Sequence, residues 1–167
     1  MNENEKKALY ERLYVSLNDL HMAKQYAEWL IKKGWHSAPY ERRGSIYMQQ
    51  SAFTTSLIVS YCRPFTKSKG WPKLPSEFVV YSAEESVLHR KIMDLRHQVY
   101  AHSDSEKYSI RPWKISEDVF TDIVGEPFRR VSADECAKLV KMIAGVSKRI
   151  RPRLTVLQRE LLGEKNA

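Results

Sequence analysis

The chain has 167 residues, 43% of them hydrophobic and 29% charged, which suits one folded domain and excludes a wholly disordered protein. Six glycines provide too few turns for a sandwich or barrel of many short strands, so we expect a mainly helical protein. The net charge of +8 favours a polyanionic partner, most simply nucleic acid.

Helical spacing of apolar residues predicts a first helix from about residue 4 to residue 33, ended by Gly34. A second helix is expected from residue 39 or 40 to about residue 63, because Pro64 disfavours the helical conformation just before it. Residues 66–81 contain two prolines and a glycine, and this composition predicts a connecting loop.

A capping box at residues 82–85 predicts the start of a third helix, which we expect to end near residues 101–104. Its apolar stripe comprises Leu88, Ile92, Leu95 and Val99. Residues 108–131 contain two prolines and a glycine and predict an irregular excursion. Short β-like pieces at 108–110 and 128–131 indicate a small hairpin within it.

A second capping box at residues 132–135 predicts a last helix that continues to about Leu162, with a kink at Pro152. The predicted fold is therefore mainly all-α, a bundle of four to five helices with an irregular or short β-hairpin excursion before the last helix. We expect residues 1–167 to form a single domain.

The positive charge is concentrated near the C-terminus, where residues 129–165 hold ten basic and four acidic residues. A polyanion would bind such a face, and four cations of the predicted last helix are candidate RNA contacts. A solvated helix surface, or one that meets an acidic protein, would have the same charge. The four candidates are Lys148, Arg149, Arg151 and Arg153.

The sequence favours a soluble cytoplasmic protein without a membrane partner. Cys62 and Cys136 have no metal-finger spacing and are too few for a disulfide scaffold, so we interpret both as reduced thiols. The polar N-terminus has no signal-peptide core, and the longest apolar stretch is too short to span a bilayer. His21, His36 and His89 do not have metal-ligand spacing, and we expect no metal site and no cofactor.

The segment most indicative of chemistry is Leu95-Arg96-His97-Gln98-Val99-Tyr100-Ala101-His102-Ser103-Asp104, at the predicted end of the third helix. Arginine binds phosphate through a planar fork of donors and stays charged at physiological pH. Histidine exchanges protons near neutrality. A base for the ribose 2′-hydroxyl, a cation at phosphorus and an acid for the leaving oxygen are what metal-free RNA cleavage requires.

This segment resembles the motif of the HEPN family, in which an arginine and a polar residue precede a histidine after four to six intervening residues. Here five residues separate Arg96 from His102. The surrounding residues 94–97 and 100–104, and Tyr61-Cys62-Arg63-Pro64-Phe65, are similar to those of HEPN proteins linked to phage abortive infection. The helix order is also similar, so the resemblance covers most of the chain.

The resemblance implies a HEPN-type helical bundle that dimerises, brings two motifs into one cleft and cuts RNA without metal, leaving a 2′,3′-cyclic phosphate. The long apolar stripes of the first and last helices are the surface that we expect a second copy to cover. An antitoxin or a nucleotidyltransferase is the kind of partner protein that the resemblance allows.

The resemblance also implies a role for each residue of the motif. Arg96 would contact phosphate and stabilise the transition state, His102 would be the general acid and base, and His97 would orient the site. Arg63, Tyr100 and Asp104 are weaker candidates for RNA contact. Each has a structural interpretation too: a surface salt bridge for Arg96, a helix-dipole contact for His102, a backbone cap for Asp104 and carbonyl binding for Arg63.

Three functions are consistent with the sequence. The first is a metal-independent endoribonuclease, either a toxin or a phage-defence effector, and the presence of Arg96, His97 and His102 favours it. The second is a catalytically inactive HEPN module that binds RNA, nucleotide or a partner protein. The third is an interaction bundle whose basic face meets an acidic protein.

Overall fold

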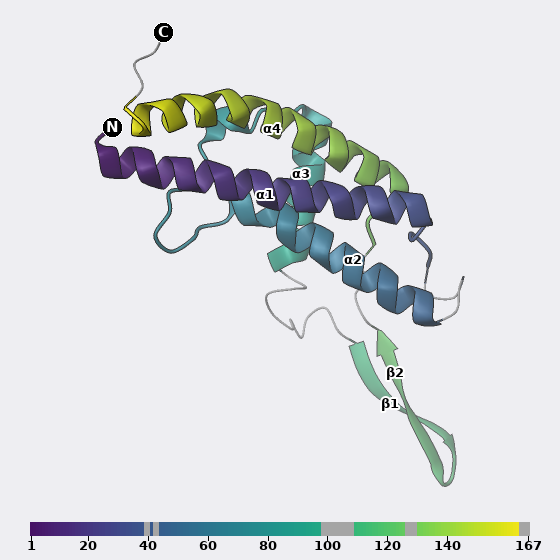
Figure 1. Cartoon of the computed structure of the whole chain (residues 1–167). Coiled ribbons are helices and arrows are strands. Elements are labelled where there is room, and N and C mark those ends of the chain that lie inside the picture. The colour runs from purple at the N-terminus through teal and green to yellow at the C-terminus, as the bar shows by residue number, and fades with distance from the viewer. Residues whose placement is uncertain (39–40, 42–43, 98–108, 126–129, 164–167) are drawn as a thin grey trace.

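The computed structural model describes residues 1–38, 41, 44–97, 109–125 and 130–163. The mainly helical fold with a hairpin before the last helix is confirmed (Figure 1). Short 3₁₀ turns η1 (Arg63–Phe65) and η2 (Ser76–Phe78) connect the second and third helices. The longer elements are α1 (Glu3–Lys33), α2 (Gly44–Cys62), α3 (Ala83–Leu95), β1 (Ser109–Ser116), β2 (Val119–Gly125) and α4 (Ala133–Leu161).

The first helix ends as the sequence predicts. Gly34 takes the left-handed conformation with φ 62°, and its N–H donates to the carbonyls of Ile31 and Leu30. At the other end, the Asn2 side chain accepts from the Glu5 amide while the Glu5 side chain accepts from the Asn2 amide. This capping box starts the helix at Glu3, one residue before the predicted start.

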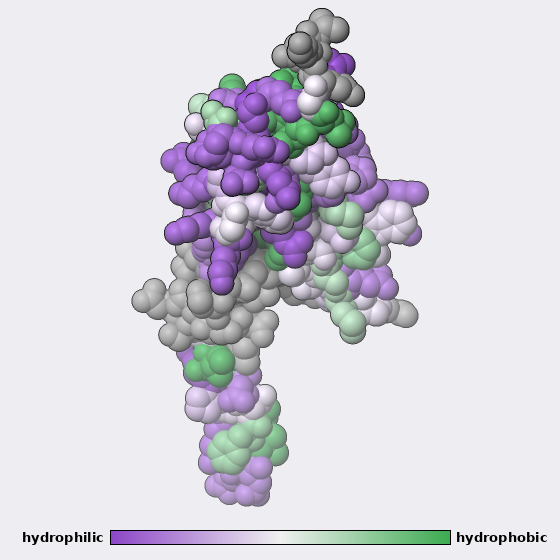
Figure 2. Space-filling view, turned by 60° about the vertical axis from the view of Figure 1, so that its left-hand side comes forward, coloured by the Kyte–Doolittle hydropathy of each residue, from purple (hydrophilic) through white to green (hydrophobic). Residues whose placement is uncertain are grey.

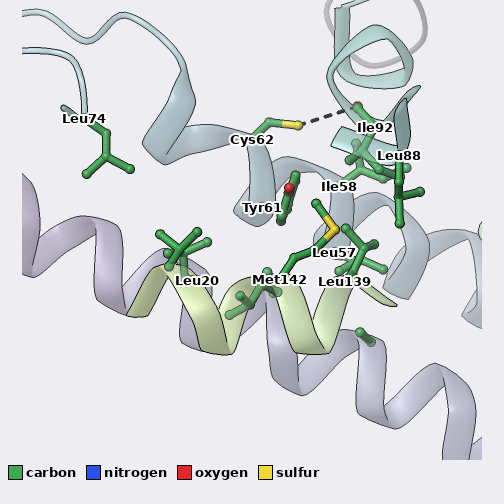
Figure 3. Packing of buried hydrophobic residues seen from close by; sticks show 14 of the residues in the cluster. Leu20, Leu57, Ile58, Tyr61, Cys62, Leu74, Leu88, Ile92, Leu139 and Met142 are labelled. Atoms are coloured by element: carbon green, nitrogen blue, oxygen red, sulfur yellow. Dashed lines mark hydrogen bonds between the residues drawn. The ribbon is translucent and has the colours of Figure 1, made fainter. Parts of the chain in front are cut away.

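Helices α1 and α4 lie antiparallel along each other, with α2 on the other side of α1 (Figure 1). The Lys6 ammonium contacts the Glu160 carboxylate at 2.7 Å, which joins the start of α1 to the end of α4. Leu20, Leu139 and Met142 are buried in one core with α2 residues such as Leu57 (Figure 3). The buried residues of the apolar stripes of α1 and α4 therefore pack into the chain's own core.

Helix α2 begins at Gly44, later than the predicted residue 39 or 40. Before the helix, the Ser37 amide donates to Gln50 Oε1, and Gln50 Nε2 donates to the Ser37 carbonyl, both at 3.0 Å. The Tyr47 hydroxyl also donates to the Ala38 carbonyl at 2.8 Å. These bonds use the backbone of residues 37–38 outside the helix; residues 39–40 and 42–43 lie outside the described residues.

The segment 66–81 connects η1 to α3 without regular structure apart from η2 and one bridge between Ser68 and Trp71. It is more than a connection, because Leu74 and Phe78 insert into the core. Arg149 of α4 holds it from outside by donating to the Phe78 carbonyl at 2.9 Å and the Val80 carbonyl at 3.2 Å. The segment is thus tied to the helices at several points.

The hairpin lies where an excursion was predicted, but its second strand is β2 rather than residues 128–131. Residues 126–129 lie outside the described residues, and Val131 is buried core, its carbonyl bonded to His36 Nδ1 at 2.9 Å. The two strands pair antiparallel from Ser109–Gly125 to Ser116–Val119. Pro112 is tolerated within β1 because a two-stranded sheet consists only of edges.

The hairpin extends away from the helices and exposes apolar side chains (Figures 1 and 2). Cross-strand pairing places Ile110 and Phe120 on one face, and Trp113 and Ile123 on the other. These four side chains are 38–67% exposed. Both faces of the hairpin are therefore uncovered within the described chain.

Helix α4 starts at the predicted capping box, where Ser132 and Glu135 exchange side-chain and backbone hydrogen bonds. It continues through Pro152 to Leu161 as one helix, curved over α1 (Figure 1). None of the described helices is long and apolar enough to cross a membrane.

Candidate functional site

Arg96 and His97 lie where α3 ends. The Arg96 amide still donates to the carbonyls of Ile92 and Met93, and residues 96–97 continue the helix as a wider π turn. Arg96 is half-buried and His97 is exposed. Such a widened turn brings two successive polar side chains to the end of an otherwise regular helix, a geometry that is frequent at functional sites.

The Arg96 guanidinium lies close to Cys62, at the end of α2. Burial raises the pKa of the Cys62 thiol to about 12, and the Arg96 charge offsets only part of this rise. The thiol instead donates to the Ile92 carbonyl at 3.6 Å, which joins α2 to α3 (Figure 3). Cys62 is thus a protonated core residue rather than a nucleophile, and it supports the helix end that holds Arg96.

Among the described residues, Arg96 has no carboxylate partner. The structural interpretation of Arg96 as half of a surface salt bridge therefore has no support in this part of the chain. The other motif residues, Tyr100, His102 and Asp104, lie in segment 98–108, outside the described residues.

Arg63 directly follows Cys62, the last residue of α2. The Arg96 side chain, which comes from the end of α3, interacts with the same Cys62. Arg63 Nη1 contacts the Asp19 carboxylate of α1 at 3.3 Å, while 60% of the Arg63 side chain remains exposed. The carbonyls at the end of α2 are bound by Arg12, which donates to the carbonyls of residues 63, 64 and 66. Arg63 is thus partly neutralised, and the carbonyl-binding role considered for it is performed by Arg12.

Polar side chains that the sequence analysis did not single out form a second cluster between α2 and α3. The Tyr61 hydroxyl lies 3.0 Å from His89 Nδ1 and 3.2 Å from the Tyr81 hydroxyl. Burial lowers the pKa of His89 and raises that of Tyr61. His89 precedes Arg96 by two helical turns, so both belong to the face of α3 that packs on α2. This cluster fixes the orientation of α3.

The four candidate cations of α4 divide into two pairs. Arg149 binds backbone carbonyls of the 66–81 segment, and Arg153 is half-buried with its guanidinium 4.0 Å from the Met1 sulfur. Lys148 and Arg151 are exposed and have no bonded partner among the described residues. Only the second pair is both exposed and without a bonded partner among the described residues.

Within the described part of the chain, no group of three or more His, Cys, Asp or Glu side chains is placed to hold a metal ion. The described residues of the motif, Arg96 and His97, offer a guanidinium and an imidazole. A guanidinium binds an anion at fixed geometry, and an imidazole exchanges a proton or a hydrogen bond.

The chain matches no family model, no curated protein and no solved structure. The resemblance to HEPN proteins therefore depends on the sequence motif and its surroundings alone.

Proposed function

We propose that this protein is a metal-independent endoribonuclease of the toxin or phage-defence type, with a site formed by Arg96, His97 and His102 and shared by two copies. The observation that carries the proposal is the end of α3, where a half-buried guanidinium without a carboxylate partner among the described residues adjoins an exposed imidazole. A guanidinium in this position can bind a phosphate through two parallel N–H donors.

The proposed chemistry divides the reaction among these groups. Arg96 binds the scissile phosphate and stabilises the negative charge that develops at phosphorus. His102 takes the proton of the 2′-hydroxyl or returns one to the leaving 5′ oxygen. His97 positions the phosphate or the second imidazole. One motif supplies too few groups for a complete acid and base pair, so a second copy completes the site.

The hairpin is the surface that we propose for the second copy. It exposes four large apolar side chains, an arrangement that is marginally stable alone and that a partner covers favourably. Its charged residues are Arg111, Lys114, Glu117, Asp118 and Asp122, so it is slightly acidic, whereas the remainder of the chain is strongly basic. This charge complementarity favours another copy of the same chain over nucleic acid as the occupant.

The test is cleavage of total RNA in EDTA by the wild-type protein, His102→Ala and Arg96→Gln. We expect the wild type to cut and to leave 2′,3′-cyclic phosphate ends, and each variant to lose about a hundredfold or more in rate. Arg90→Gln is the matched control, because Arg90 is exposed on α3, about 1.7 helical turns before Arg96. Equal cutting by wild type and both variants would exclude this site.

A catalytically inactive module that binds RNA, nucleotide or a partner protein is the second candidate. It is favoured by Lys148 and Arg151, which offer exposed charge for binding on a different element from the Arg96 motif. RNA binding without cleavage by the wild-type dimer would decide for this function.

A further inference from the structure

A groove of about 330 Å³ lies between α1 and α4, on the solvent side of their contact. Its walls are His21 and Lys24 from α1 and Ser147, Lys148 and Arg151 from α4. The two helices contribute opposite sides, because their antiparallel alignment brings the middle of α1 beside the middle of α4. Two of the four candidate cations, Lys148 and Arg151, thus lie opposite His21 and Lys24, which the sequence analysis did not consider as RNA contacts.

The groove follows from residue size and helical period. His21 and Lys24 are three residues apart, and Lys148 and Arg151 have the same spacing, so each pair lies on one face of its helix. Between them α4 carries Ala144 and Ser147, whose short side chains leave the space open. Larger side chains at 144 and 147 would fill the groove.

The groove is positively charged and contains no acidic group. Its lining residues include three permanent cations and no Asp or Glu. The Lys24 ammonium lies 3.5 Å from the carboxylate of Glu28, one helical turn later. This ion pair is half-exposed and therefore weak, so an anion can replace the carboxylate at little cost. Lys148 and Arg151 have no bonded partner among the described residues. Donors are present from ammonium, guanidinium, imidazole and hydroxyl groups, all suited to phosphate oxygens.

We propose that this groove binds successive phosphates of a single-stranded RNA chain, an inference that rests on the proposed RNA-directed function. His21, Lys148 and Arg151 are exposed, so each contact alone is weak and binding strength comes from several phosphates along one strand. Lys148 and Arg151 lie on α4 and Lys24 lies on α1, so the cations are spread over both walls of the groove rather than gathered on one helix. A site for a small free anion would instead need buried donors converging on one point.

The experiment measures the affinity of the full chain for a fluorescein-labelled single-stranded RNA of about 12 nucleotides by anisotropy. It uses His102→Ala as the parent, so that the proposed cleavage does not consume the probe. Lys24→Gln, Lys148→Gln and Arg151→Gln are combined in one variant. The matched control removes three exposed cations elsewhere, as Lys7→Gln, Lys69→Gln and Lys73→Gln.

We expect the groove variant to bind about tenfold or more weakly at low salt, and the control by less than about threefold. The slope of log affinity against log salt should decrease by about 2 in the groove variant, because three phosphate contacts are lost at about 0.7 each. Equal losses of RNA affinity in the groove and control variants would overturn the proposal, because RNA would then respond to the net charge of the protein and not to the groove. Displacement of RNA by micromolar inorganic phosphate would also overturn it, in favour of a small-anion site.

The two proposals fail separately. RNA that binds in the groove but is never cut by the wild-type chain leaves the groove proposal intact and rejects the nuclease. RNA that is cut by the wild type, yet bound equally by the parent and the groove variant, rejects the groove and leaves the nuclease intact.

Discussion

The Tyr61 hydroxyl and the His89 ring nitrogen Nδ1 lie 3.0 Å apart, and this hydrogen bond joins α2 to α3 inside the molecule. Phe65 packs edge-on against the same imidazole with ring centroids 4.8 Å apart. The bond therefore holds an imidazole among aromatic rings, two turns before the helix end that carries Arg96. The protonation state of His89 is consequently linked to folding.

The first prediction concerns the pH dependence of stability. Burial lowers the pKa of folded His89, so below about pH 6.5 the unfolded chain takes up this proton more readily than the folded one. The contribution of His89 is therefore complete above that pH and is lost as the pH falls toward the lowered pKa. Tyr61, Tyr81 and Glu85 are the titratable groups that surround it. The melting temperature should fall more between about pH 6.5 and 5 in the wild type than in His89→Gln, and parallel curves would contradict this.

The second prediction concerns Arg12, which is buried and donates to three carbonyls around η1 and to the Ser68 hydroxyl. Arg12→Met removes the Arg12 donors from the Pro64 and Thr66 carbonyls, whereas the Arg63 carbonyl keeps the amide and hydroxyl of Thr66. We expect the free energy of unfolding to fall by about 3 kcal/mol. Arg63→Met at the exposed Asp19 pair should cost less than about 1 kcal/mol. Urea unfolding measures both, and equal effects would show that Arg12 does not organise this turn.

Local signals were sufficient to predict most of the fold. The capping boxes at residues 82–85 and 132–135 depend on side chains within one turn, so both helix starts were correct. The predicted start of α2 was too early, because the helix begins at Gly44. The bonds from Gln50 to the backbone of Ser37 are contacts that no local pattern reveals. The second strand was placed too late, because buried Val131 belongs to the core and has the same apolar character as a strand residue.

The candidate site was less accessible to sequence reasoning. The sequence predicted that the third helix ends near residues 101–104, whereas α3 ends at Leu95 and is followed by the π turn at residues 96–97. Residues 98–108 lie outside the described residues. Spacing could not distinguish Arg149, which binds backbone carbonyls, from Arg151, which lines a groove, because the difference depends on which elements lie beside α4. Arg12 and His21 act through partners more than fifty residues away, so only the folded chain identifies them.

The third prediction uses this division of the α4 cations. Arg149→Ala removes the donors to the Phe78 and Val80 carbonyls, and we expect a loss of about 1 kcal/mol in the free energy of unfolding with unchanged RNA affinity. Arg151→Ala should show the reverse: unchanged stability, because the side chain is exposed and unpaired among the described residues, and weaker RNA binding. Thermal unfolding and anisotropy on the same preparations test both. Similar behaviour of the two variants would contradict the assignment.

The last prediction concerns the hairpin. Replacing residues 109–125 with a short glycine-serine linker removes exposed apolar side chains that contribute little to the helical core. The melting temperature at low concentration should therefore change by less than about 2 °C, whereas self-association should be lost. Trp113→Ser with Phe120→Thr removes one exposed apolar side chain from each face and should weaken association without deleting the strands. The control is Val87→Ser, which removes an exposed apolar side chain from α3. Sedimentation velocity measures the outcome: dimers that persist in both hairpin variants would show that the second copy binds elsewhere.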